Sequence, residues 1–149
     1  MEILTKNQSK TKKAGEVLAK KTVKKPTSRK AFVLALQGDL GGGKTTFLQG
    51  FAKGLGIKER VLSPTFVLMK RFPIKNKKSG FKNFYHLDCY RVKNHKDLAS
   101  LDFKKIISDP SNIVAIEWAE RVKKALPPSA SVLKFDFINK TTRKIIFKK

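Results

Sequence analysis

The stretch AFVLALQGDLGGGKTTF, residues 31–47, passes from an apolar run through four glycines to one lysine and two threonines. Residues 31–38 have the length of a strand and no polar alternation, which indicates a strand buried on both faces of a parallel sheet. From Lys44 onward, apolar residues recur with the 3.6-residue period of a helix, and Gly56 supplies a stop. The order of strand, glycine loop and helix predicts an α/β fold.

Residues 38–45, GDLGGGKT, satisfy the phosphate-loop pattern G-x-x-x-x-G-K-[ST] in full. Glycines allow positive φ angles that turn backbone N–H groups inward, at a helix N-terminus whose dipole favours anions. We therefore expect Lys44 to reach the β- and γ-phosphates, Thr45 to ligate Mg²⁺ and Thr46 to touch the α-phosphate. The residues predicted to hold a nucleoside triphosphate are Gly38, Asp39, Leu40, Gly41, Gly42, Gly43, Lys44, Thr45 and Thr46.

Hydrolysis by such a loop needs an acidic residue near the metal, at the end of a buried strand. Glu117 ends the apolar run IVAIE, and Asp88 lies within FYHLDCYR. Both are candidates for holding Mg²⁺ or positioning a water, and the alternative for each is a carboxylate paired with a neighbouring Lys or Arg. Thr65, in a loop predicted at 63–65, is placed where a switch loop could sense the γ-phosphate.

Two ring-bearing residues near these acids receive different interpretations. Trp118 is typical of a packing residue rather than a recognition residue. Because it follows Glu117, its indole is still expected near bound nucleotide, where its fluorescence would report binding. His86 is interpreted as a strand histidine that faces solvent or a partner, without a ligand role. With two histidines in the chain, a zinc site is not predicted.

The remaining sequence predicts alternating helices and strands. Residues 9–25 are expected to form a surface helix with Ser9 as its cap and Ala14, Val17 and Leu18 at helical spacing. Further along, the patterns predict a hairpin of strands near 66–72 and within 81–92, a helix over 95–109, a strand ending at 117, and a hairpin of strands 131–138 and 143–149 across NKTT.

Length and composition limit the possible classes of protein. With 149 residues and a hydrophobic fraction of 40%, the chain fits one domain over residues 1–149. Its single cysteine, Cys89, excludes an intrachain disulfide. The start lacks the apolar region of a signal peptide, and no apolar run approaches the roughly 20 residues needed to cross a bilayer. We therefore expect a cytoplasmic protein without a membrane partner.

The charge balance is strongly basic, with 34 Lys and Arg against 11 Asp and Glu and a formal net charge of +23. Such a surface attracts polyanions such as tRNA. The alternative is a lysine-rich composition spread over solvated faces, and charge alone does not separate the two.

Five segments together resemble one family closely. They are TKKAGEVLA at 11–19, GDLGGGKTTF at 38–47, SPTF at 63–66, YHLDCYR at 85–91 and IEWAER at 116–121. Their order and spacing resemble the TsaE (YjeE) family of bacterial ATPases, which take part in making threonylcarbamoyl-adenosine on tRNA. The chain departs from the family at Ala119, where Pro is frequent, and at Asp102, where Gly is frequent, and both differences concern loop shape.

The resemblance implies a three-layer P-loop NTPase-like fold, with a mixed, mainly parallel sheet between helices and a C-terminal antiparallel hairpin. It implies ATP and Mg²⁺ as cofactors, with Thr45 and Glu117 serving the metal and Asp88 supporting the metal or the attacking water. Thr11 matches a family position near the nucleotide base. The implied partner is the TsaB–TsaD heterodimer, on which ATP hydrolysis depends and whose TsaD subunit transfers the threonylcarbamoyl group. Contact with tRNA is implied either directly or through the complex.

Other functions remain open from the residues alone. A small-molecule kinase could use the same loop, but it usually needs an arginine-bearing lid, and the lid-like stretch at 71–82 is better interpreted as a hairpin loop. A GTPase usually carries N-K-x-D, whereas NKTT ends in Thr142. A basic RNA-binding module with a vestigial nucleotide site is the alternative from a different class.

Overall fold

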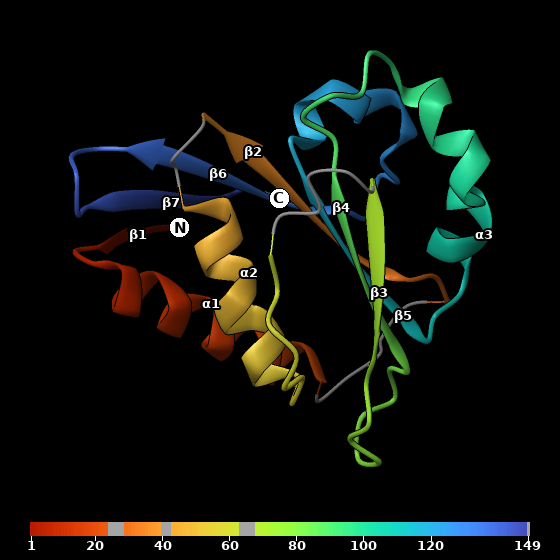
Figure 1. Ribbon diagram of the computed structural model, residues 1–149, viewed down its shortest axis with the longest axis horizontal. Coiled ribbons are helices and arrows are strands. Elements are labelled where there is room, and N and C mark those ends of the chain that lie inside the picture. The colour runs from red at the N-terminus through yellow and green to blue at the C-terminus, as the bar shows by residue number, and fades with distance from the viewer. Residues whose placement is uncertain (24–28, 40–42, 63–67, 149) are drawn as a thin grey trace.

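The computed structural model describes residues 1–23, 29–39, 43–62 and 68–148, which form helices around one seven-stranded sheet (Figure 1). The strands are β1 (Glu2–Thr5), β2 (Phe32–Gly38), β3 (Met69–Pro73), β4 (Asn83–Asp88), β5 (Asn112–Glu117), β6 (Ser131–Phe137) and β7 (Arg143–Lys148). The helices are α1 (Gln8–Val23), α2 (Lys44–Gly54) and α3 (Phe103–Ser108), with 3₁₀ helices η1 (His95–Leu101) and η2 (Ala119–Ala125). No helix in these ranges is long and apolar enough to cross a membrane.

The sheet is parallel at its centre and antiparallel at its edges. Its strand order is β1-β7-β6-β2-β5-β4-β3, and the pairs β6–β2, β2–β5 and β5–β4 are parallel. The outer pairs β1–β7, β7–β6 and β4–β3 are antiparallel. The predicted α/β class, with a mixed sheet around a parallel centre and a C-terminal hairpin, is confirmed.

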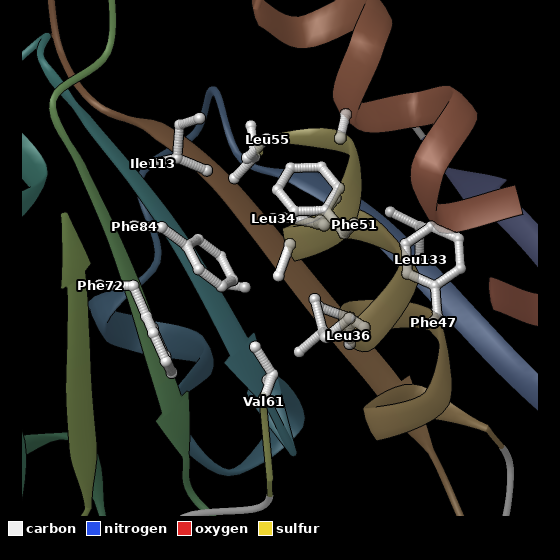
Figure 2. Close-up of a cluster of buried hydrophobic side chains, with 14 of the residues drawn as sticks. Leu34, Leu36, Phe47, Phe51, Leu55, Val61, Phe72, Phe84, Ile113 and Leu133 are labelled. Carbon is white, nitrogen blue, oxygen red and sulfur yellow. The ribbon is translucent and has the colours of Figure 1, made fainter. Parts of the chain in front are cut away.

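Both faces of the sheet are covered, which makes three layers. Leu34 and Leu36 of β2 belong to the core beneath α1 and α2, which Figure 2 shows. Val33 and Ala35, which alternate with them, belong to a second core beneath η1, α3 and η2. Figure 1 shows α1 and α2 on one side of the sheet and α3 on the other. The unbroken apolar run of β2 is explained, because neither of its faces meets water.

Helices α1 and α2 approach so closely that glycine is required between them. A Cβ atom at Gly50 would lie 1.8 Å from the carbonyl oxygen of Lys12, and one at Gly15 would lie 2.0 Å from that of Phe47. Backbone therefore rests on backbone at both positions. This contact fixes α2, and with it the start of α2 at Lys44, against the rest of the molecule.

The predicted helix over 9–25 is confirmed as far as Val23, and residues 24–25 lie outside the described residues. Its buried stripe differs from the expected one. Val17 is 42% exposed, and Ala14 and Leu18 are only partly buried. The buried positions are Thr11, Gly15, Ala19 and Thr22. Small side chains occupy this stripe because the close approach of α2 leaves no room for larger ones.

Two predicted elements have different limits in the structure. The helix expected over 95–109 is divided at Asp102, whose φ of 55° and ψ of 37° lie in the left-handed region and interrupt helical hydrogen bonding between η1 and α3. The strand expected at 66–72 is observed as β3 from Met69 onward, and the loop predicted at 63–65 lies outside the described residues. The hairpin formed by β3 and β4 is confirmed.

Candidate nucleotide site

The predicted site residues come together where three parallel strands end. Gly38 ends β2, Asp88 ends β4 and Glu117 ends β5. Asp88 and Glu117 are direct neighbours in the β4–β5 register, and Glu117 is paired with Leu36 two residues before Gly38. The carboxyl edge of a parallel sheet is where ligands of α/β proteins bind.

The described part of the predicted phosphate loop has the backbone that its glycines permit. Gly38 has a φ of +131°, and a Cβ atom there would lie 2.2 Å from the carbonyl oxygen of Phe135 on β6. Gly43 has a φ of +95° and lies at the N-cap position of α2. Because glycine has no side chain, it provides no side-chain cap to the first N–H groups of α2. Leu40, Gly41 and Gly42 were predicted to bind phosphate and lie outside the described residues.

Lys44 is directed into this loop. Its side-chain Nζ donates to the carbonyl oxygens of Gly38 at 2.5 Å and Asp39 at 3.0 Å, and it lies 4.1 Å from the centroid of the Trp118 ring. Burial lowers the pKa of the Lys44 ammonium, while the carboxylates around it, Glu117 foremost, act in the opposite direction. A buried ammonium with little water around it gains strongly from an added anion.

Thr45 and Glu117 bring two oxygen atoms together. The Thr45 hydroxyl donates to Oε1 of Glu117 at 2.8 Å. Hydroxyl and carboxylate oxygens suit Mg²⁺, and adjacent ligands of an octahedral Mg²⁺ are about 2.9 Å apart. The pair therefore fits this ion in both chemistry and spacing. Within the described residues, the hydrogen-bond partners of Glu117 are Thr45 and His86 rather than a Lys or Arg.

The second oxygen of Glu117 meets His86. Nε2 of His86 lies 2.5 Å from Oε2 of Glu117, and the two residues are 0% and 3% exposed. The interpretation of His86 as a histidine facing solvent or a partner is wrong, because β4 carries its side chain into the interior beside the end of β5.

The other predicted residues are placed around this centre. Asp88 is partly buried, and its Oδ1 accepts a hydrogen bond from the Tyr90 N–H at 3.0 Å. Thr46 is half-buried in the first turn of α2. Thr65 lies outside the described residues. Among the described residues, no group of three or more His, Cys, Asp or Glu could hold a metal ion.

Thr11 lies at the far end of the phosphate loop. Its hydroxyl shares a 2.7 Å hydrogen bond with Thr5 of β1, and its methyl carbon lies 3.5 Å from where a Cβ atom of Gly43 would be. Arg143 of β7 approaches the same point, with its Cγ at 3.4 Å. Residues from both ends of the chain therefore surround the start of α2.

Sequence reasoning did not assign three residues that the structure brings to the site. They are His86, Arg143 and Glu120, whose Oε2 accepts a hydrogen bond from the Gly38 N–H at 3.1 Å. His86 and Glu120 lie inside the segments YHLDCYR and IEWAER, so a signal for them existed. No sequence pattern indicated Arg143, because only the folded β6–β7 hairpin brings it close to Gly43.

Trp118 has a strained backbone and a stacked side chain. Its φ of 58° is rare for a bulky residue. Its ring centroid lies 5.0 Å from that of Tyr90, and the Arg121 guanidinium lies over both rings, at 5.6 Å and 5.4 Å. The indole is thus held beside Lys44, where contact with nucleotide stays a prediction.

Comparison with known proteins points to one family. The profile of the family described as threonylcarbamoyl adenosine biosynthesis protein TsaE matches residues 5–145. The tRNA threonylcarbamoyladenosine biosynthesis protein TsaE of Bacillus subtilis is 40% identical over 95 residues, which are 64% of this chain and 55% of that protein. The protein of the same name from Rickettsia felis is 31% identical over 142 residues, 95% of this chain and 75% of that protein.

The fold has a solved counterpart as well. A crystal structure of Bacillus subtilis YdiB is similar with a TM-score of 0.74 and 28% identity, over 99% of this chain and 83% of that one. Several curated relatives are longer than the matched region, since the chain spans 55%, 54% and 65% of three of them. The profile match covers nearly all of the described sheet and every described residue of the site. The chain therefore belongs to the TsaE family of threonylcarbamoyl adenosine biosynthesis proteins.

Proposed function

We propose that this chain is a Mg²⁺-dependent ATPase that serves tRNA threonylcarbamoyladenosine synthesis together with the TsaB–TsaD heterodimer. The observation that carries the proposal is the Thr45–Glu117 oxygen pair at the start of α2, beside the buried Lys44 ammonium. A structural carboxylate would not need a threonine from the first turn of a phosphate-loop helix as its partner.

Each part of the site has a task in this proposal. The uncapped N-terminus of α2 and the Lys44 ammonium bind the phosphates, and Thr45 and Glu117 hold Mg²⁺. When bound, the metal neutralises charge on the β- and γ-phosphate oxygens. Asp88, oriented by the Tyr90 N–H, accepts a hydrogen bond from the attacking water. The Trp118 ring covers Lys44 and limits the access of solvent.

The proposed partners follow from the family and from charge. Family membership supports the heterodimer, and the net charge of +23 supports contact with tRNA. Because the proposed partners act on tRNA, we place the protein in the cytoplasm.

The test is ATP hydrolysis by the purified chain, alone and with the TsaB–TsaD heterodimer. Hydrolysis is expected to appear or rise with the heterodimer and to fall at least about 100-fold in Glu117→Ala. Lys44→Ala is expected to lose both ATP hydrolysis and nucleotide binding. Glu59→Ala serves as a control, because Glu59 lines an open groove together with Gln49 and Val61 and is not one of the carboxylates that act on the pKa of Lys44.

Two outcomes would contradict the proposal. Transfer of labelled γ-phosphate to a metabolite would favour the small-molecule kinase. The structure gives that alternative little support, because residues 74–82 connect β3 to β4 as a hairpin rather than forming a lid. Salt-sensitive tRNA binding without any nucleotide binding would favour the RNA-binding module.

A further inference from the structure

We propose that His86 is a positioning residue that holds the Glu117 carboxylate in the orientation needed for Mg²⁺. The inference rests on the proposed function, because it concerns the metal site of that function. His86 contacts Oε2 of Glu117, while Oε1 is left for Thr45. The histidine acts through Glu117 and touches neither the metal nor the nucleotide.

The strand register brings these residues to one face. Phe84, His86 and Asp88 alternate along β4, and Phe84 belongs to the core beneath α2. Ala115 and Glu117 lie on the same face of β5, and Ala115 is the register partner of His86. The small side chain of Ala115 leaves room for the imidazole to reach forward to Glu117.

The contacts of the ring define its role as a donor. A carboxylate oxygen can only accept, so Nε2 of His86 carries the hydrogen in the 2.5 Å contact. Nδ1 is buried and has no hydrogen-bond partner among the described residues. A buried lone pair at Nδ1 without a hydrogen-bond partner costs less free energy than a buried N–H without one. This difference favours the tautomer that carries its hydrogen on Nε2.

This arrangement removes the freedom that the Glu117 side chain would otherwise have. Glu117 is 3% exposed, so water does not replace a lost donor easily. With Oε2 engaged by His86, rotation of the carboxylate away from Thr45 breaks a buried hydrogen bond. Groups that orient a metal ligand in this way typically change metal affinity about 10- to 100-fold when removed.

The test measures Mg²⁺ dependence rather than turnover. Binding of ADP is followed by calorimetry over a series of Mg²⁺ concentrations, for the wild type, His86→Leu, His86→Asn and His86→Gln. The Gln amide can reach Oε2 with an N–H, the Asn amide is too short, and Leu has no donor. Phe84→Leu is the matched control, because it disturbs the same face of β4 without touching Glu117.

The expected result is a Mg²⁺ half-saturation raised about 10- to 100-fold in His86→Leu and His86→Asn and largely restored in His86→Gln. Phe84→Leu should lower thermal stability while keeping the wild-type half-saturation. ADP affinity measured with EDTA should be the same in all folded variants, because the phosphate loop is unaltered.

Three outcomes would overturn the inference: wild-type Mg²⁺ dependence in His86→Leu, equal behaviour of the Asn and Gln variants, or an equal shift in Phe84→Leu. Should His86→Leu fail to fold, the comparison of Asn with Gln decides. Failure of the proposed function has a different signature, since the wild type would then bind ADP without any Mg²⁺ dependence or not at all.

Discussion

Asp102 occupies a backbone conformation that favours glycine. Its φ of 55° lies in the left-handed region, which costs about 1–2 kcal/mol for most residues and less for Asp. We expect Asp102→Gly to raise the free energy of unfolding by up to about 1 kcal/mol, measured by urea denaturation. Lys104→Gly, in the regular turn of α3, is the control and should lower stability by a similar amount. A less stable Asp102→Gly would show that the aspartate side chain contributes more than the strain removes.

Cys89 is buried, and burial together with the charge of Asp88 raises the pKa of its thiol to about 12. The native thiol therefore stays protonated, and we expect a thiol reagent to modify it only when the chain unfolds. In the unfolded chain the thiol ionises from about pH 9. The contribution of the buried Cys89 thiol to the free energy of unfolding is therefore complete below about pH 9, and it is lost as the pH rises towards about 12.

Comparison with Cys89→Ala isolates this effect from the titration of the lysines. The difference in free energy of unfolding between wild type and variant should shrink as pH rises above about 9. A difference that does not change between pH 8 and 11 would contradict the burial argument.

The contact between α1 and α2 links helix packing to the proposed nucleotide site. A Cβ atom at Gly50 would meet the Lys12 carbonyl oxygen at 1.8 Å, so Gly50→Ala must push the helices apart. We expect a loss of at least about 2 kcal/mol in chemical denaturation. Nucleotide affinity should fall too, because α2 carries Lys44 and Thr45 at its start.

Lys53→Ala is the matched control for this prediction, since it shortens a side chain that lines an open groove on the same helix. Its stability should change by less than about 0.5 kcal/mol. Equal stability of the two alanine variants would mean that the helices can separate at little cost.

An open groove on the surface brings several of the molecule's cations together. An open groove of about 570 Å³ is lined by four cations and one acid. The charged residues are Lys12, Lys53, Lys58, Arg60 and Glu59. Cations that neighbour one another across a groove can follow a phosphate backbone, which gives the proposed tRNA contact a location to test.

We expect the triple variant Lys53→Glu, Lys58→Glu and Arg60→Glu to weaken tRNA binding at least about 10-fold at low salt. The slope of log affinity against log salt concentration should decrease by about 2. The control is Lys75→Glu, Lys77→Glu and Lys78→Glu, which makes the same change of net charge in the β3–β4 connection. Equal losses in binding experiments with both variants would mean that only total charge matters.

Patterns of short range predicted much of the fold. The apolar run of β2, the glycine spacing of residues 38–43 and the period of α2 depend on neighbours within a few residues, and each was confirmed where the structure describes it. The break at Asp102 was not predicted, because the apolar period continues through it. The prediction of which residues of α1 are buried was wrong, because hydrophobic spacing does not reveal how closely another helix approaches.

Sequence alone was sufficient for the α/β class. The phosphate loop and the roles of Thr45, Asp88 and Glu117 stay predictions, which sequence could make because strand ends and glycine loops are local features. The partners of these residues required the folded chain. His86 meets Glu117 across 31 residues of sequence, and Glu120 meets Gly38 across 82. Strand order and register decide such contacts, and both follow from the packing of two apolar cores rather than from any local pattern.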